Sequence, residues 1–309
     1  FEAKAYAVRT RTGMRSPLNC GPKGPIHRFE FDGREPFFVA LGQPEVMEIE
    51  KNSDVFTNEP ASNMAAHRIS LDEPKEPSMV NTLINMDGEE HKSHRALVND
   101  WFKPGAVRQL EDQIKDQARR SVDEMQALGG SCDFASDIAM NYPLRVILDI
   151  LGLDEAEFPR MLRFTQELFG SEDPDFERAG EDDQMMAVIM DVIGLFTGLN
   201  AERRSNPTHD LATVIANGQI NGQPLEDMDT YGYYLIVATA GHDTTSNAIA
   251  GGMEALLANP DQLQRLLDDP SLIDAATDEI VRWVSPVSTS CARATDFTLA
   301  SGHTFIAGL

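Results

Sequence analysis

The chain has 309 residues, with 26 Lys and Arg against 50 Asp and Glu, so its formal net charge is −24. An acidic surface of this kind repels nucleic-acid phosphates and anionic lipid headgroups, which associate with clustered cations. We therefore expect neither a nucleic-acid nor a membrane partner. The sequence opens without a basic and apolar leader, and its longest apolar run is far shorter than the ~20 residues of a membrane span. We expect a cytoplasmic location. The three cysteines are widely spaced, which suits reduced intracellular thiols better than a disulfide framework.

In chain order, the first predicted elements are two strands at 26–31 and 34–41. Asp32 and Gly33 lie between them and supply the positive φ angles that a tight hairpin turn requires. A short helix follows at 45–52. The next stretch, to Asp87, is rich in Pro, Ser, Asn and Met and shows no steady period, so it is predicted to be a long loop.

Helical spacing dominates from Gly88 onward. Trp101 and Phe102 end the first predicted helix as expected core residues, and Gly129-Gly130 closes the second. The further predicted helices span 142–152, 157–170, 184–204, 230–259, 261–269 and 273–284, and a second hairpin is predicted from 296–300 and 303–308. With no repeat or linker in the sequence, we expect one domain over 1–309, mostly α with a small β-sheet.

Polar residues interrupt the longest apolar helix, which is otherwise predicted to run unbroken through 230–259. Asp243 lies between two apolar segments, where a carboxylate is costly to bury unless it is paired or used. Thr244 can bond the carbonyl one turn back and bend the helix, and Gly241 removes a side chain from one face. Together they predict a groove flanked by a hydroxyl and an acid. The alternatives are that Asp243 and Thr244 face solvent, and that His242 only packs or caps.

Two further patterns place charges at helical spacing. His91 and Arg95 are four apart on one helix face, where they suit a pair of carboxylates or phosphates, or form a solvated surface. His94 together with His91 could instead bind a metal, although no third ligand has suitable spacing. Glu279 and Arg282 are three apart, close enough to pair, which is also a common surface pattern.

These patterns, in this order, resemble the cytochrome P450 superfamily of haem-thiolate monooxygenases, in its soluble bacterial branch, over essentially the whole chain. "AGHDTT" is similar to the oxygen-groove motif of that family. "EHKSHR" is similar to the helix that holds a haem propionate, and "EIVR" to the Glu-x-x-Arg pair behind the haem. The resemblance implies the P450 fold and a haem b cofactor. It assigns the site residues Asp243, Thr244 and Gly241 as catalytic; His91, Arg95, Arg293 and Ala240 as cofactor-binding; and Glu279 with Arg282 as a structural pair.

The axial thiolate loop of the family has no counterpart in the sequence. Cys291 follows Arg282 too closely and lacks the glycines of that loop, and neither Cys20 nor Cys132 fits better. The chain also begins without an initiator Met and stops inside a predicted strand. We therefore expect a fragment, incomplete at both ends, that binds haem poorly and is inactive as it stands.

The resemblance implies insertion of one atom of O2 into a hydrophobic small molecule, a terpenoid or steroid-like compound. Thr244 would donate a hydrogen bond to the bound oxygen, and Asp243 would relay protons from solvent. Because the chain has no dinucleotide fingerprint and no cysteine cluster, a ferredoxin and an NAD(P)H-dependent reductase are expected as partners. The candidate residues for ferredoxin docking are Lys103, Arg108, Lys115, Arg119 and Arg120, and those for substrate contact are Met64, Met79, Leu83, Ile84 and Phe169. A non-catalytic helical scaffold and a metal-dependent hydrolase are the alternatives.

Overall fold

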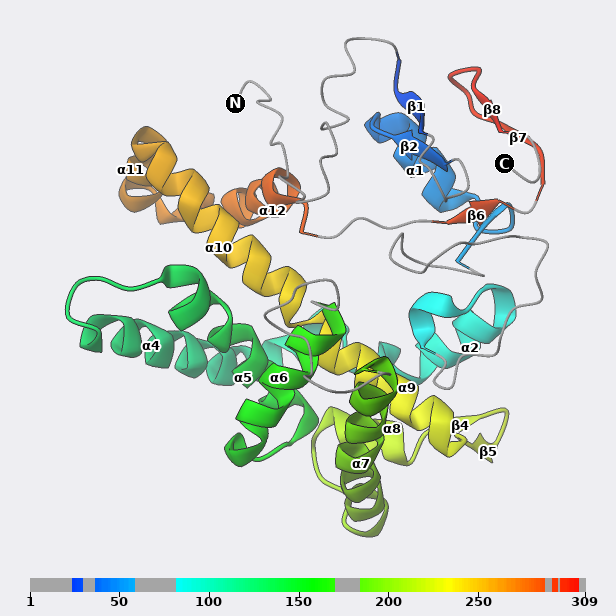
Figure 1. Ribbon diagram of the computed structural model, residues 1–309, viewed down its shortest axis with the longest axis horizontal. Coiled ribbons are helices and arrows are strands. Elements are labelled where there is room, and N and C mark those ends of the chain that lie inside the picture. The colour runs from blue at the N-terminus through cyan, green and yellow to red at the C-terminus, as the bar shows by residue number, and fades with distance from the viewer. Residues whose placement is uncertain are drawn as a thin grey trace. The chain divides into compact units, whose positions relative to one another are not determined.

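The computed structural model describes residues 24–29, 37–58, 82–169, 184–286, 291–293 and 295–305. Contacts within the chain divide it into two compact units. The smaller combines Phe1–Lys75 with Ser290–Leu309, and the larger is Glu76–Thr289. Helices dominate the described residues and the sheets are small, which confirms the predicted fold class (Figure 1).

The smaller unit contains three of the two-stranded sheets and one helix. Its elements are β1 (Ile26–Phe29), β2 (Phe37–Ala40), α1 (Gln43–Lys51), β3 (Phe56–Thr57), β6 (Ala292–Arg293), β7 (Phe297–Thr298) and β8 (Thr304–Phe305). All three sheets are antiparallel: β1 pairs with β2, β3 with β6, and β7 with β8. Phe56 and Phe305 pack edge to face, with ring centroids 5.7 Å apart, in a small aromatic core. The strand pairing of both predicted hairpins and the short helix are therefore confirmed, while the predicted turn at Asp32 and Gly33 lies outside the described residues.

The larger unit contains the remaining elements. Its first half consists of η2 (Leu83–Asn85), α2 (Gly88–Asn99), α3 (Pro104–Val107), η3 (Arg108–Leu110), α4 (Glu111–Ala127), η4 (Phe134–Ala139), α5 (Asn141–Leu151), η5 (Glu155–Glu157) and α6 (Phe158–Phe169). Its second half consists of α7 (Gln184–Ser205), α8 (Leu211–Ala216), β4 (Gln219–Ile220), β5 (Gln223–Pro224), α9 (Asp227–Ala240), α10 (Asp243–Ala258), α11 (Pro260–Asp268), η7 (Pro270–Leu272) and α12 (Ile273–Val284).

Helix α9 lies at the centre of the larger unit's core. Tyr233 and Tyr234 are almost completely buried, and Tyr234 stacks on Phe196 of α7 with ring centroids 4.8 Å apart. The Tyr234 hydroxyl donates to the carbonyl of Ala212 in α8 at 3.1 Å. A helix that is apolar around most of its circumference has to be enclosed by others, and here α5, α7 and α8 enclose it.

The unbroken helix predicted over 230–259 is wrong. Helix α9 ends at Ala240, a turn follows at Gly241 and His242, and α10 begins at Asp243. At the turn the amide of His242 bonds the carbonyl of Thr239, three residues back, at 3.3 Å. Thr239 and Thr244 each donate a hydroxyl to the carbonyl four residues back, and such bonds bend helices.

The turn packs near a second irregular element, the π-helix η4, which runs directly into α5. Pro143 lies in the first turn of α5, where proline is tolerated. Neither this π-helix nor the β4–β5 hairpin was predicted from the sequence, although Asn221 and Gly222 in that hairpin form a typical turn pair with positive φ.

The two residues predicted to end the first helix in the core differ in burial. Trp101 packs against the main core, but Phe102 is 50% exposed and is not a core residue. Among the described residues, no helix is both long enough and apolar enough to cross a membrane.

Candidate functional site

The turn between α9 and α10 presents Asp243 and Thr244 as the first two residues of α10. Both side chains are partly buried, whereas Thr245 is exposed. The Thr244 hydroxyl donates to the carbonyl of Ala240 at 2.9 Å. The Asp243 carboxylate accepts a hydrogen bond from the side-chain Nδ2 of Asn247, one turn further on, at 3.2 Å. The helix dipole places partial positive charge at the N-terminus of α10, which stabilises the negative charge of the Asp243 carboxylate.

His242 is buried at this turn, with only 2% of its surface exposed. Its Nε2 atom lies 2.9 Å from the carbonyl oxygen of Met140, at the junction of η4 and α5. Burial lowers the pKa of the His242 imidazole, against a smaller opposing effect of the bond to Met140 and the charge of Asp243. The sequence pattern gave no sign of this long-range contact, because Met140 is 102 residues away.

Gly241 allows α9 and α5 to approach closely. A Cβ atom at this position would lie 2.5 Å from Cδ1 of Ile147. The space that glycine leaves on this side is therefore filled by an α5 side chain. The predicted role of Gly241 in making room for a diatomic ligand stays a prediction, and the geometry adds a packing role.

Helix α2 carries the predicted cation pair. His91 is partly buried and Arg95 is exposed, and neither side chain makes a hydrogen bond or ion pair to any described residue. His94, three residues after His91, is buried and stacks on Tyr233 with ring centroids 6.2 Å apart. The Tyr233 hydroxyl donates to the carbonyl of His94. These contacts dock α2 on α9 and do not involve His91 or Arg95.

The docking point of α2 lies close to the turn. Tyr233 and Ala240 are seven residues apart and so share one face of α9, about 10 Å apart along its axis. Helix α2 therefore contacts α9 near its middle, whereas Asp243 and Thr244 follow its end.

The Glu279–Arg282 pair forms as the spacing predicts. Arg282 donates from Nε and Nη2 to the two carboxylate oxygens of Glu279, each at 2.6 Å. Hydrogen bonding to Arg282 lowers the pKa of the Glu279 carboxyl. Arg293 lies in β6 of the smaller unit, and its side chain is outside the described residues. Its predicted role therefore stays a prediction.

A metal site at His91 and His94 gains no support. Within the ranges that the structure describes, no group of three His, Cys, Asp or Glu side chains could hold a metal ion. Of the cysteines, Cys132 is partly buried and Cys291 is exposed, while Cys20 lies outside the described residues.

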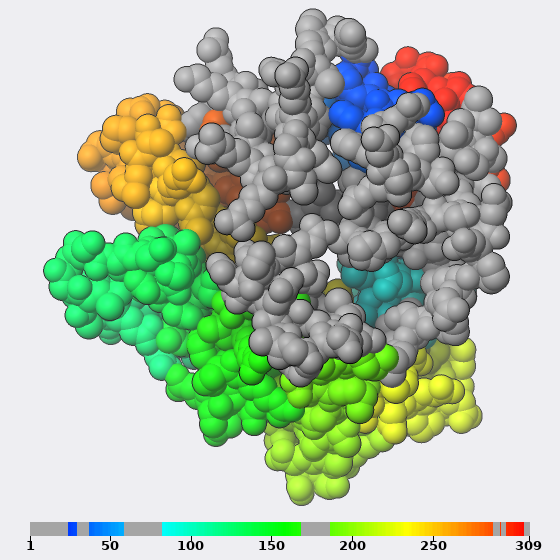
Figure 2. Space-filling model, viewed as in Figure 1, coloured from blue at the N-terminus to red at the C-terminus, as the bar shows by residue number. Residues whose placement is uncertain are grey.

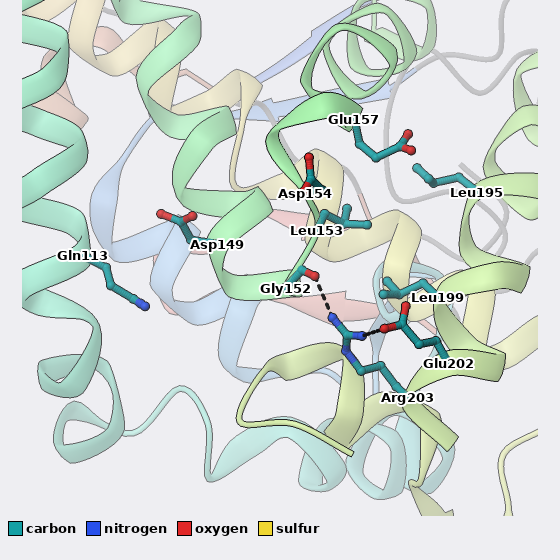
Figure 3. A pocket seen from close by; sticks show the side chains of 10 residues that line it. All are labelled: Gln113, Asp149, Gly152, Leu153, Asp154, Glu157, Leu195, Leu199, Glu202 and Arg203. Atoms are coloured by element: carbon teal, nitrogen blue, oxygen red, sulfur yellow. Dashed lines mark hydrogen bonds and ion pairs between the residues drawn. The ribbon is translucent and has the colours of Figure 1, made fainter. Parts of the chain in front are cut away.

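A cleft of about 600 Å³ opens elsewhere in the larger unit, beside α5 and α7. It is lined by Gln113, Asp149, Gly152, Leu153, Asp154, Glu157, Leu195, Leu199, Glu202 and Arg203. The Arg203 guanidinium lies between the Gly152 carbonyl and the Glu202 carboxylate (Figure 3). None of the predicted site residues lines this cleft, so it is separate from the candidate site.

Comparisons with known proteins agree with the motif order. A family model described as Cytochrome P450 matches residues 24–269. The chain is 34% identical over 281 residues to Cytochrome P450-terp of a Pseudomonas species, covering 85% of this chain and 64% of that protein. It is 30% identical to a steroid C26-monooxygenase of Mycolicibacterium smegmatis, covering 83% of this chain and 58% of that protein. The chain thus spans less than two thirds of the length of these relatives.

Solved structures show the same similarity. CYP108D1 from Novosphingobium aromaticivorans is 34% identical, with a TM-score of 0.80 over 93% of this chain and 69% of that one. A Mycobacterium marinum cytochrome P450, CYP268A2, solved with pseudoionone, is 27% identical, with a TM-score of 0.81 over 93% of this chain and 70% of that one.

Proposed function

Since this chain belongs to the cytochrome P450 family, we propose that it forms the greater part of a haem-dependent monooxygenase that inserts one oxygen atom into a hydrophobic small molecule. The observation that carries the proposal is the interruption at Gly241 and His242. It sets an acid and a hydroxyl side by side at the start of α10. In a continuous helix, Asp243 and Thr244 would instead lie within an unbroken series of backbone hydrogen bonds, with no turn before them.

The residues present fit a haem. His91 and Arg95 are cationic or hydrogen-bonding groups on neighbouring positions of α2, without protein partners among the described residues, as an anionic propionate requires. Ala240, whose carbonyl accepts from Thr244, is a further proposed contact. The part of Arg293 rests on the resemblance alone. When bound, haem iron with a thiolate ligand supplies the binding and reductive activation of dioxygen.

The chain's own part of the proposed chemistry is proton delivery. The Thr244 hydroxyl hydrogen is held by the Ala240 carbonyl, so the hydroxyl can receive a hydrogen bond before it gives its own proton elsewhere. Asp243 is partly open to solvent, so its carboxylate can exchange protons with water. Its bond to Asn247 keeps it beside Thr244.

The proposed substrate is a terpenoid or a steroid-like side chain. Support comes from the names of two relatives, Cytochrome P450-terp and a steroid C26-monooxygenase. Of the residues predicted to contact substrate, Leu83 packs against the core and Ile84 is 46% exposed. Met64 and Met79 and the side chain of Phe169 lie outside the described residues.

The proposed electron donors are a ferredoxin and an NAD(P)H-dependent reductase. The basic patch predicted for ferredoxin docking is weakened by its neighbours, because carboxylates pair with four of its five cations. These pairs are Lys103 with Asp100, Lys115 with Glu111, Arg119 with Asp116, and Arg120 with Glu124 and Glu155. The surface of α4 that carries most of them is visible at the left of Figure 2. A docking role for this surface, and a cytoplasmic location, stay predictions.

The proposed function is tested in the complete gene product expressed with haem. The reduced protein with carbon monoxide should show the long-wavelength Soret band of thiolate-ligated haem. A terpenoid or steroid should be oxidised at the expense of NAD(P)H and O2 once a ferredoxin and reductase are added. Protein that folds but takes up no haem would support a helical scaffold, and bound zinc with hydrolysis would support the hydrolase.

The role of Thr244 has a matched control in the adjacent Thr245, which is exposed. Thr244→Ala should lower product formed per NAD(P)H by about tenfold or more and release hydrogen peroxide instead. Thr245→Ala should leave this ratio close to that of the unmodified enzyme. Equal ratios in both variants would remove Thr244 from proton delivery.

A further inference from the structure

His242 makes a contact that neither the motif nor the proposed chemistry uses. Its ring is 2% exposed, and its Nε2 lies 2.9 Å from the carbonyl of Met140. The Met140 carbonyl can only accept, so Nε2 carries the hydrogen and donates it. Burial lowers the pKa of this imidazole and keeps it neutral, which leaves Nδ1 without a hydrogen. Nδ1 is buried and has no hydrogen-bond partner.

The acceptor belongs to a rigid part of the core. Met140 connects the π-helix η4 to α5, and its own amide bonds the carbonyl of Ala135 at 3.0 Å. Helix α5 is deeply buried along one face, including Leu144 and Leu148. A bond from His242 to this junction therefore attaches the turn to a fixed point outside its own helices.

The backbone of His242 is also tied to α10. Its carbonyl accepts from both the amide and the hydroxyl of Ser246, each at 2.9 Å. On the other side, Gly241 lies against Ile147 of α5. Three contacts thus hold the turn: those of the His242 ring, the His242 carbonyl and Gly241. Asp243 and Thr244 follow the turn directly.

We propose that His242 is a positioning residue that holds the α9–α10 turn against the η4–α5 junction, and thereby sets the placement of Asp243 and Thr244. The inference rests on the proposed function for its catalytic consequence. Its structural part stands without haem. Loss of the bond frees the turn to shift and removes one donor from the partly buried Met140 carbonyl.

Two substitutions of His242, to Gln and to Asn, differ by one methylene. They separate the effect of the hydrogen bond to Met140 from the effect of side-chain volume. The Nε2 of Gln in His242→Gln occupies the place of the histidine Nε2 and can reach Met140. In His242→Asn the amide nitrogen lies where Nδ1 was and cannot reach. His242→Phe keeps the ring volume and removes the donor.

The first readout needs no haem and uses amide hydrogen exchange in this chain. Exchange at 242–246 should be about tenfold faster in the Asn and Phe variants, as expected for loss of one buried hydrogen bond, and close to the unmodified rate in Gln. Equal exchange in all four proteins overturns the proposal. If the variants fold poorly, ¹⁵N NMR of the unmodified chain decides: a neutral ring protonated at Nε2 supports the bond, and an Nδ1-protonated ring overturns it.

The second readout is coupling in the complete haem-loaded enzyme. The His242→Asn and His242→Phe variants should release about tenfold more peroxide per product than the unmodified enzyme. The His242→Gln variant should form as much product per NAD(P)H as the unmodified enzyme. Unchanged coupling in Phe, despite faster exchange, overturns the catalytic consequence. If the unmodified protein shows no haem band at all, the proposed function fails, while the exchange experiment still decides the structural role of His242.

Discussion

Gly241 and Ile147 lie so close that a Cβ atom on the glycine would be 2.5 Å from Cδ1 and 3.3 Å from Cγ1 of the isoleucine. Ile147 is 7% exposed and belongs to the main core, so it has little room to move. The backbone of Gly241, at φ −85° and ψ −15°, suits any residue. Contact with α5, and not backbone freedom, is therefore the reason for glycine at this turn.

Gly241→Ala should consequently destabilise the chain by about 1–3 kcal/mol, the usual cost of overpacking a core. Adding Ile147→Val removes Cδ1 and should recover part of that loss, which a double-mutant cycle of urea unfolding would measure. Gly198→Ala is the control, because it lies within α7 with no atom within 4 Å of the added Cβ. That control should be neutral or slightly stabilising, and additive effects of the first two changes would contradict the contact.

Gly152→Ala should destabilise the chain through two separate effects. Gly152 caps α5 with φ +65°, which costs other residues roughly 1–2 kcal/mol. An added Cβ would also lie 2.1 Å from Oδ2 of Asp210 and disturb the Arg203–Asp210 ion pair. Gly129→Ala has a similar φ of +78° and open space around the Cβ, so it should show only the first effect. Thermal or urea unfolding of both variants measures the difference, which equal losses would disprove.

The Arg203–Asp210 pair should make stability fall at acid pH. Burial raises the pKa of the Asp210 carboxyl, but hydrogen bonds from Thr208, Thr213 and Arg203 outweigh it and hold the pKa below its ordinary value. A depressed folded-state pKa gives stability that is complete above the unfolded-state pKa. This stability is lost as pH falls through the folded-state value.

Asp210→Asn keeps an acceptor for the Thr213 amide but leaves the buried Arg203 with only the more exposed carboxylate of Glu202 as an ion partner, at a cost of about 3 kcal/mol or less near neutral pH. The loss should shrink as pH falls through the aspartate range, which urea unfolding at a series of pH values would show. Asp154→Asn is the control, since Asp154 caps η5 in an exposed position. A loss independent of pH would mean that the charge is not what stabilises the fold.

Haem affinity should depend on the two unpartnered side chains of α2. His91→Ala and Arg95→Ala should each weaken haem binding by about 10- to 100-fold in the complete protein, the value of one charge-assisted hydrogen bond. Lys92→Ala is the matched control, because Lys92 is an exposed cation on the same helix whose nearest carboxylate, Glu89, is 4.0 Å away. Haem titration measures affinity, and unfolding shows that α2 stays intact. A similar loss for Lys92→Ala would point to general charge and not to a site.

Local rules predicted the helices well. The elements at 45–52, 142–152, 157–170, 184–204 and 273–284 all formed within a few residues of their expected bounds, because apolar periodicity and flanking Gly or Pro are local signals. The Glu279–Arg282 pair also follows from spacing alone. The order of the motifs was enough to indicate the family, which the comparisons confirm.

The sequence by itself determined the helical class, the family and the pair of residues, Asp243 and Thr244, at the candidate site. Only the tertiary structure decided how that pair is presented. Glycine is needed at position 241 because of Ile147, and the contact of His242 depends on Met140, which lies next to a π-helix. Periodicity reports which residues share a face of one helix. It contains no information about which side chain of another helix fills the space beside a glycine, because that is settled by packing between distant segments.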